Sequence, residues 1–337
     1  MVSATFTLPI LNLPDPWPAS VESHPPLNER KAASPRIEWI ERKGRALHTS
    51  PYGANGDVLA LNLARGCSHR CGFCAARANA SHPGDSVMHV YGHTPQFVEE
   101  ELASRRRMPR AVLISPATDP FPPSSEAQAE TVRVIQLLAS RRVEAWLMTR
   151  GFIRPFAMKT LIANANFVKV MIGLTTMDRG LQLLLEHGAA SPRLRFRQLA
   201  RLMQSGVRVQ VALDPLIPGL TDTGANLELL LAGLARHGVR QVAASYMFLR
   251  PAIAENLRAL LQPHGWDEMV LDAYTGGPVL ASDGIAPARY LPRARRQRGY
   301  AALMALASRH GITVQVNALS NPDFVRAKSS IVEVARG

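Results

Sequence analysis

Short apolar runs alternate with longer helical stretches through the middle of this chain, and this alternation limits the folds it can adopt. The apolar runs, each of strand length, are residues 58–63, 111–115, 144–148, 167–174, 208–213 and 241–248. The helical patterns between them lie near residues 94–105, 125–140, 154–164, 191–205 and 225–237. Because the runs are apolar almost throughout, both faces of each strand are expected to be covered, as in a parallel sheet packed against helices. The sequence therefore predicts an α/β fold built from repeated strand–helix units.

Glycines mark the same boundaries. Gly206, Gly238 and Gly311 each follow a helical stretch and precede an apolar run. Glycine is favoured just past the C-terminus of a helix, because it adopts the left-handed conformation without a Cβ penalty. We therefore expect helices to end at these three positions.

The two ends of the chain differ in composition from its middle. We divide the chain into an N-terminal arm, a strand–helix domain and a C-terminal extension, at residues 1–55, 56–250 and 251–337. The arm is rich in proline and weakly periodic, which predicts an extended or partly disordered segment with Trp17, Trp39 and Ile40 as candidate anchors. The extension carries a basic helical stretch near residues 292–310 and an apolar run at 312–316, and is expected to close the open side of the sheet.

Length and hydropathy favour a chain with a sizeable core and no membrane span. With 337 residues and 47% hydrophobic residues, it can form one large α/β domain with appendages or two smaller domains. No apolar stretch approaches the roughly 20 residues needed to cross a bilayer, and the first 30 residues lack the basic start and apolar run of a signal peptide. We expect a cytoplasmic protein, and the sequence does not specify its oligomeric state.

All three cysteines of the chain, Cys67, Cys71 and Cys74, fall within eight residues with the spacing CxxxCxxC. Three thiolates on one loop can bind three irons of a four-iron, four-sulfur (4Fe-4S) cluster, which normally takes four cysteines. The fourth iron would then be open for chemistry. A disulfide framework is disfavoured because the number of cysteines is odd and nothing else in the sequence suggests secretion. A structural zinc site with His69 or His82 as fourth ligand is the alternative, although such sites usually bring a second ligand pair.

The formal charge of +13 gathers partly in three arginine runs, at residues 105–107, 193–197 and 293–298. A surplus of this size favours polyanions such as nucleic acid, since neutralising phosphates releases counterions. We expect the run at 293–298, with Arg295, Arg296 and Arg298, to lie beside the active site and hold such a substrate. The alternative is that an arginine-rich composition reflects a genome rich in G and C.

The cysteine loop and three further motifs occur in a fixed order at the ends of the predicted strands. Residues 62–77 are close to the pattern RGCxHxCxxCxAR, and Thr118-Asp119-Pro120 follows the second strand. Thr149-Arg150 follows the third strand, and the fifth leads into residues 214–222, which match PxIPGLTD. Together these motifs resemble the radical S-adenosylmethionine (SAM) superfamily, and within it the spore photoproduct lyase-like branch, also labelled DNA repair photolyase-like. The resemblance covers residues 57–250 and extends less closely to Asp323.

The resemblance implies a partial (βα)6 barrel of the TIM type, with the cysteine loop after its first strand. It implies an enzyme, of lyase or transferase type, that reductively cleaves SAM at the cluster to a 5′-deoxyadenosyl radical, which abstracts hydrogen from a substrate. A reductant protein of the flavodoxin or ferredoxin type would supply the electron. Nucleic acid or a nucleotide is the expected substrate, a peptide or small metabolite is the alternative, and a non-catalytic zinc protein is the third hypothesis.

The resemblance also assigns residues to the cofactor. Cys67, Cys71 and Cys74 would bind the cluster, which the ring of Phe73 would shield while its backbone meets adenine. The remaining SAM contacts would come from the strand ends: Ser115 and Thr118 to the amino group or ribose, Arg150 to the carboxylate, Thr175 and Thr176 to the carboxylate or ribose, and Ile217, Pro218 and Gly219 to adenine.

One family feature is missing. Spore photoproduct lyase uses a further cysteine outside the cluster as a hydrogen-atom donor, and this chain has no fourth cysteine. Tyr91, Tyr246 and Tyr274 are the candidates for a hydrogen relay in its place; otherwise the product quenches the radical or the substrate is different. The same absence disfavours a second, cysteine-ligated cluster.

Overall fold

The computed structural model describes residues 35–50, 52, 56–282, 285–317, 320–324 and 331–332. Most of the predicted proline-rich arm, with Trp17, lies outside the described residues. Of the other two candidate anchors, Trp39 is 47% exposed and Ile40 is half-buried.

The core of the molecule is a nine-stranded sheet with the order β14-β13-β10-β9-β8-β7-β6-β3-β2. Its six central strands are all parallel, and they are β3 (Val58–Leu61), β6 (Ala111–Ile114), β7 (Glu144–Thr149), β8 (Val168–Gly173), β9 (Arg208–Leu216) and β10 (Gln241–Tyr246). Neighbours in the sheet are neighbours in the chain, so right-handed crossovers place the connecting helices on one face. The predicted partial barrel of strand–helix units is confirmed.

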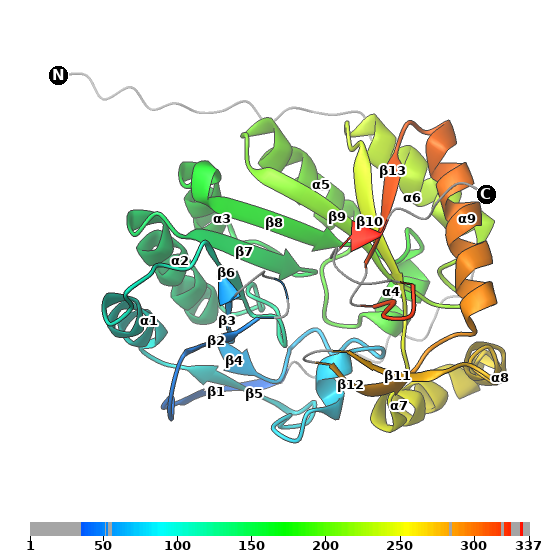
Figure 1. The fold of residues 1–337 in the computed structure, drawn as a ribbon, viewed down its shortest axis with the longest axis horizontal. Helices are drawn as coiled ribbons and strands as arrows, with labels where there is room; N and C mark the ends of the chain where they lie inside the picture. The colour runs from blue at the N-terminus through cyan, green and yellow to red at the C-terminus, as the bar shows by residue number, and fades with distance from the viewer. Residues whose placement is uncertain are drawn as a thin grey trace.

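Helices connect these strands and cover the outer side of the sheet (Figure 1). Those on the outer side are α1 (Thr94–Ala103), α2 (Ser125–Ser140), α3 (Pro155–Ala163), α5 (Pro192–Gln204) and α6 (Gly224–Arg236), whereas α4 (Arg179–Leu185) lies by the ends of the strands. Serine, aspartate or threonine caps several of them; the Ser124 hydroxyl, for example, accepts from the backbone N–H of Ala127 at 3.1 Å at the start of α2. At their other ends, Gly206 and Gly238 have positive φ, as predicted for helix C-termini.

The apolar strand residues predicted to be buried on both faces are buried. Val58, Val112, Val170 and Val242 have no exposed surface. Burying a valine, leucine or isoleucine side chain stabilises the folded state by roughly 1.5–3 kcal/mol relative to leaving it exposed. The sheet interior therefore supplies much of the stability that holds the strand ends in place.

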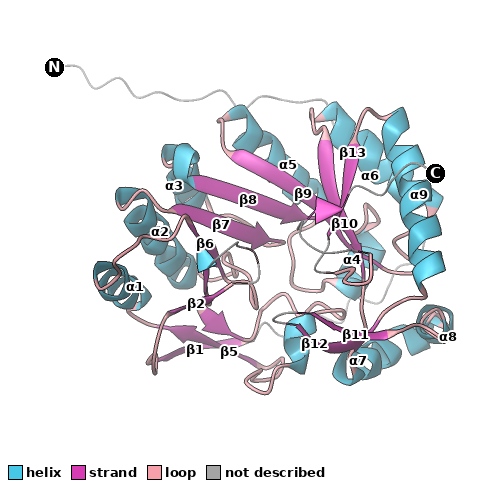
Figure 2. Cartoon of the chain, in the orientation of Figure 1, coloured by secondary structure: helices cyan, strands magenta, loops and turns pink. Residues whose placement is uncertain are grey.

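Further strands extend the sheet at both edges (Figure 2). β2 (Leu47–Thr49) pairs antiparallel with β3, β13 (Thr313–Asn317) pairs parallel with β10, and β14 (Ile331–Val332) pairs antiparallel with β13. A separate three-stranded sheet contains β1 (Arg36–Ile40), β5 (Val87–Tyr91) and β4 (Ala64–Arg65). It lies beside the ends of β2 and β3 (Figures 1 and 2).

The chain after β10 forms helices and a hairpin at one end of the barrel (Figure 1). These elements are α7 (Pro251–Leu261), α8 (Asp267–Asp272), β11 (Val279–Ser282) and β12 (Ile285–Arg289). Helix α9 (Arg293–Arg309) follows them and runs beside the sheet, next to β13. Helix α9 packs against α6. No helix in the described part of the chain is both long enough and apolar enough to cross a membrane.

Two arginines of the basic runs are buried inside the protein. Arg296, which has no exposed surface, donates from Nη1 and Nη2 to the carboxylate of Asp323 at 2.8 and 2.6 Å and from Nε to the carbonyl of Leu291 at 3.0 Å. Arg195 is 1% exposed and pairs with Glu186. The expectation that Arg296 contacts a polyanion is therefore wrong, because its buried guanidinium binds Asp323 and Leu291 and so holds the segment around Asp323 to α9.

Candidate functional site

The three cysteines lie on the loop between β4 and the short 3-10 helix η2 (Ala75–Ala78), after the first barrel strand. Cys71 is buried, and Cys67 and Cys74 are half-buried. Tight turns fold the loop: the N–H of Arg70 donates to the carbonyl of Cys67 at 3.4 Å, and that of Cys74 donates to Cys71 at 3.2 Å. Gly66 begins the loop with a φ of +78°, and a Cβ there would come within 2.8 Å of Pro83. Glycine is required at this position on both counts.

Neighbouring elements hold the cysteine loop on several sides. The N–H of Gly72 donates to the carbonyl of Leu185 at the end of α4 (2.8 Å), and its own carbonyl accepts from Nδ2 of Asn256 on α7 (2.7 Å). Nε of Arg77 donates to the carbonyl of Cys71 at 3.0 Å. Segments far apart in the sequence thus fix the backbone that carries the thiols.

A buried ion pair joins the cysteine loop to two strand ends. His69, which lies between Cys67 and Cys71, has Nδ1 3.2 Å from Oδ2 of Asp119, the aspartate that follows β6. Both side chains are almost fully buried. Asp119 also accepts from the hydroxyl of Thr149 at 2.8 Å and from the N–H of Arg150 at 2.7 Å, both at the end of β7. Burial alone would raise the pKa of Asp119, but His69 and the backbone donors outweigh burial and lower it.

Arg150 follows β7 directly, and protein oxygens hold its guanidinium. Its Nε donates to Oε1 of Glu186 at 2.9 Å, and its Nη2 donates to the carbonyl of Asp214. Glu186 is fully buried and also accepts from Nη2 of Arg195, so one carboxylate bridges two arginines. Cζ of Arg150 lies 5.4 Å from the centroid of the Phe73 ring. A fixed positive charge therefore stands beside the cysteine loop.

The environment of the thiols suits metal ligation. Burial raises the pKa of Cys71 and Cys74, and the nearby thiols raise it further, whereas Arg150 lowers it. Because the thiolate is the metal-binding form, bound metal would provide the positive charge that these buried sulfurs need. Across the described residues, no group of three or more His, Cys, Asp or Glu side chains surrounds a single metal-ion position. In a cubane each cysteine thiolate binds a different iron, and three cysteines on one loop are the donor type that such a cluster takes.

The residues predicted to contact SAM lie at or just after the C-terminal ends of successive strands. Ser115 follows β6 with a φ of +58° and is buried. The hydroxyls of Thr118, after β6, and Thr175, after β8, are buried and meet no hydrogen-bond partner within the described part of the protein. Thr176 differs, because its hydroxyl accepts from the N–H of Asp178 at 3.0 Å. Two orphaned hydroxyls are therefore available to a ligand at this end of the barrel.

Pro218 and Gly219 lie in the turn that follows β9. Gly219 has a φ of +73°, and its N–H donates to Oδ1 of Asp222 at 2.7 Å. The hydroxyl of Thr221 closes the same turn by accepting from the N–H of Ile217 at 2.7 Å. Side chains of the turn itself thus hold its backbone at the end of β9.

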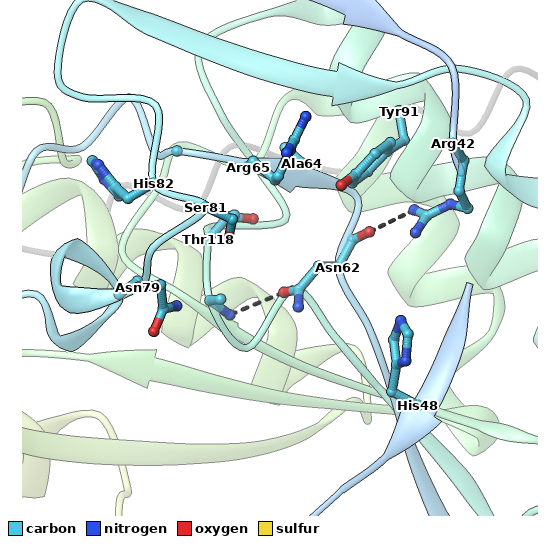
Figure 3. Close-up of a pocket in the computed structure, with 13 residues that line it drawn as sticks. Arg42, His48, Asn62, Ala64, Arg65, Asn79, Ser81, His82, Tyr91 and Thr118 are labelled. Carbon is cyan, nitrogen blue, oxygen red and sulfur yellow. Dashed lines mark hydrogen bonds between the residues drawn. The ribbon is translucent and has the colours of Figure 1, made fainter. Parts of the chain in front are cut away.

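The tyrosines proposed for a hydrogen relay fall in two places. Tyr246 donates to Oδ2 of Asp222 at 3.1 Å, and Tyr274 donates to the carbonyl of Met247 at 2.8 Å; both are buried, and burial raises the pKa of each phenol. Tyr91, at the end of β5, instead lines a cavity of about 280 Å³ beside the cysteine loop (Figure 3). The motifs did not assign a role to His69, Asp119 or Glu186. The first two stand inside the quoted motifs, whereas nothing in the sequence marks Glu186.

Comparison with known proteins finds relatives without an assigned activity, and no protein-family model matches the chain. An uncharacterised protein of Mycobacterium tuberculosis is 27% identical over 199 residues, which is 56% of this chain and 58% of that protein. The chain thus matches little more than half the length of this relative. An uncharacterised protein of the Acidianus two-tailed virus is 24% identical over 251 residues, 70% of this chain and 79% of that protein.

Solved structures give a clear match to one fold. Spore photoproduct lyase complexed with dinucleoside spore photoproduct superposes with a TM-score of 0.64 at 14% identity, over 82% of this chain and 81% of that one. A mutant of the same enzyme with bound AdoMet and dinucleoside spore photoproduct gives a TM-score of 0.62 at 14% identity with the same coverage. The chain therefore has the fold of spore photoproduct lyase, which is the fold that its cysteine loop and strand-end motifs predict.

Proposed function

We propose that this protein is a radical SAM enzyme that cleaves SAM reductively and abstracts hydrogen from a nucleic acid or nucleotide. The observation that carries the proposal is the placement of three thiols on one loop, tied by His69 and Asp119 to the ends of the second and third barrel strands. When bound, a 4Fe-4S cluster would supply the electron for SAM cleavage. A reductant protein of the flavodoxin or ferredoxin type, in a reducing cytoplasm, would return an electron to the cluster.

The surrounding residues have roles that follow from their chemistry. Cys67, Cys71 and Cys74 would hold the cluster, and the largely buried ring of Phe73 would keep water from it. Arg150 carries a permanent charge beside the loop and would pair with the SAM carboxylate.

Two unpaired hydroxyls and the turn after β9 would complete the SAM site. The hydroxyls of Thr118 and Thr175 lack partners in the described structure and would bind the amino group or ribose, with Ser115 and Thr176 nearby. The turn with Pro218 and Gly219 would pack against adenine.

A nucleic-acid or nucleotide substrate is supported by two observations. The structurally similar spore photoproduct lyase has been solved with a dinucleoside spore photoproduct. Several arginines of the basic runs are exposed, Arg295 and Arg298 among them. The burial of Arg195 and Arg296 favours the alternative of a peptide or small metabolite, because these two charges cannot contact a nucleic acid. As hydrogen donor we favour Tyr91 over Tyr246 and Tyr274, because it borders a cavity.

Anaerobic reconstitution with iron and sulfide tests the proposal. We expect about four irons per chain, a broad visible absorbance and formation of 5′-deoxyadenosine from SAM and reductant. Each of Cys67→Ala, Cys71→Ala and Cys74→Ala should remove most of the iron and all SAM cleavage, while Ser140→Ala, on the exposed C-terminus of α2, should change neither. A chain that binds only zinc, or an alanine variant that keeps full iron and normal cleavage, would refute the assignment.

A further inference from the structure

The cavity beside the cysteine loop has the chemistry of an anion site. It lies between β5, the loop residues on either side of the cysteines and the ends of β3 and β6, with a volume of about 280 Å³. Two arginines and two histidines line it: Arg42, Arg65, His48 and His82. No carboxylate is among the described residues that line it.

Acidic side chains that act on the lining residues are already engaged. Asp85 acts on His82, but its carboxylate pairs with the guanidinium of Arg77. Glu101 lies close enough to Arg42 to act on its charge, but its two carboxylate oxygens accept from the backbone N–H groups of Ala46 and Leu47 at 2.5 and 3.1 Å. The cavity therefore keeps a surplus of positive charge.

Both arginines have hydrogen-bonding capacity left over. Arg42 is 7% exposed; its Nη2 donates to the carbonyl of Asn62 at 2.6 Å, but its buried Nε meets no acceptor in the part of the chain that the structure describes. Nε of Arg65 is likewise buried and unpaired there. An unsatisfied buried donor costs about 1–3 kcal/mol, so these groups call for an acceptor that the folded chain does not itself supply.

Tyr91 fixes the two guanidiniums. Cζ of Arg42 lies 4.0 Å and Cζ of Arg65 lies 5.9 Å from the centroid of its ring (Figure 3). The guanidiniums of Arg42 and Arg65 match the oxygens of a phosphate.

We propose that this cavity binds a phosphate group of the substrate and thereby positions a nucleotide unit next to the cysteine loop. The inference rests on the proposed function and narrows it to substrates that carry a phosphate. Arg150 does not line this cavity; it follows β7 and lies beside the ring of Phe73. The pocket therefore serves the substrate and not the SAM carboxylate.

Binding of a short single-stranded oligothymidylate, measured by fluorescence anisotropy with the reconstituted chain, tests the site. Arg65→Gln should weaken binding on the order of tenfold and lower the dependence of log affinity on log salt by about one, as for one lost phosphate contact. Arg65→Lys, which keeps the charge, should retain most of the affinity. Arg201→Gln, the same change at an exposed arginine of α5 outside the basic runs, should alter binding less than about twofold. A methylphosphonate-linked probe, which has the same bases without charge, should bind all four proteins alike.

The arms of the experiment separate the possible outcomes. Equal effects of Arg65→Gln and Arg201→Gln would overturn the proposal, and so would an Arg65→Gln chain that loses SAM binding together with probe binding. Failure of the chain to cleave SAM would instead retract the proposed function, because the binding assay does not depend on radical chemistry.

Discussion

The imidazole Nδ1 of His69 lies 3.2 Å from Oδ2 of Asp119, and this buried pair joins two sequence motifs into one structural unit. His69 belongs to the cysteine motif, and Asp119 belongs to Thr118-Asp119-Pro120 after the second barrel strand. Burial alone would lower the pKa of His69, but the charge of Asp119 and the neighbouring Cys67 raise it to about 10, so the pair is ionised at neutral pH. The orientation of the cysteine loop thus depends on a residue outside it.

Asp119→Asn should loosen this unit. Asparagine lacks the negative charge that pairs with His69. Its amide NH2 would also face a backbone N–H group that a carboxylate oxygen of Asp119 now accepts from. We therefore expect the free energy of unfolding, measured in urea, to fall by about 2–3 kcal/mol. The reconstituted variant should also release iron to a chelator faster than the wild type. Asp57→Asn, whose carboxylate pairs with the half-exposed Arg110, should cost less than about 1 kcal/mol. Equal stability losses in the two variants would contradict this role for Asp119.

Arg150→Ala is expected to weaken SAM binding by about 1.5–3 kcal/mol, as for a lost charge-assisted hydrogen bond in a buried site. Arg150→Lys should keep part of the affinity, because it preserves the charge without the planar fork. Titration calorimetry under nitrogen measures both. Arg141→Ala, at a half-exposed ion pair on the far end of α2, is the control. If Arg150→Ala loses stability but binds SAM normally, the arginine has only the structural role that its contact with Glu186 implies.

The pairing of Glu186 with two arginines predicts a pH dependence of stability. Burial would raise the pKa of this carboxyl, but Arg195 and Arg150 outweigh burial and lower it below its ordinary value near 4.5. A carboxyl with a lowered folded-state pKa stabilises the protein above the unfolded-state pKa, and this contribution is lost as pH falls through the folded-state pKa. Wild-type stability should therefore decline below about pH 4.5.

Glu186→Gln should cost about 3–5 kcal/mol at pH 7, since it leaves two buried guanidiniums facing a neutral amide. Its unfolding free energy, measured with urea across acid pH, should then fall less steeply than that of the wild type. Glu99→Gln, an exposed pair with Arg141, should follow the wild-type curve within about 0.5 kcal/mol. Parallel acid curves for Glu186→Gln and the wild type would argue against an ionised Glu186.

The basic helix α9 should separate into structural and exposed arginines. Arg296→Gln breaks the buried pair with Asp323 and should lower stability by about 3 kcal/mol. The double variant Arg295→Gln, Arg298→Gln should leave stability within about 0.5 kcal/mol but reduce the salt dependence of nucleic-acid binding. Thermal unfolding and the anisotropy assay measure the two effects. A double variant with unchanged salt dependence would favour a peptide or small metabolite as substrate.

Most of the fold could be predicted because the barrel strands and helices are long and strongly patterned. The predicted helix at residues 125–140 coincides with α2, and the predicted strands at 111–115 and 144–148 coincide with β6 and β7 to within one residue. Short elements were missed, such as the two-residue β4, whose existence depends on pairing with β5. Helix α7 was also missed, although the spacing of Ile253, Leu257 and Leu261 by four residues is typical of a helix.

The candidate site could be predicted in part. The cysteine loop and the order of the strand-end motifs are local patterns, so their positions at the strand ends followed from the fold. Contacts between distant segments leave no such pattern. The burial of Arg296 depends on Asp323, which follows a strand and a turn, and Glu186 carries no motif at all. The cavity around Tyr91 likewise joins β5 with the ends of β3 and β6, which no stretch of sequence shows together.

The hydrogen bond from Asn256 to the carbonyl of Gly72 spans 184 residues, and it makes helix α7 a reporter of the cysteine loop. Whatever binds to and orders the loop in the folded state also stabilises the elements that open together with it. Slower amide exchange in α7 upon loading of the loop would therefore reveal occupancy at a distance, without any change in the helix itself. Through the same bond, helix α7 influences how tightly the cysteine loop retains a bound cluster.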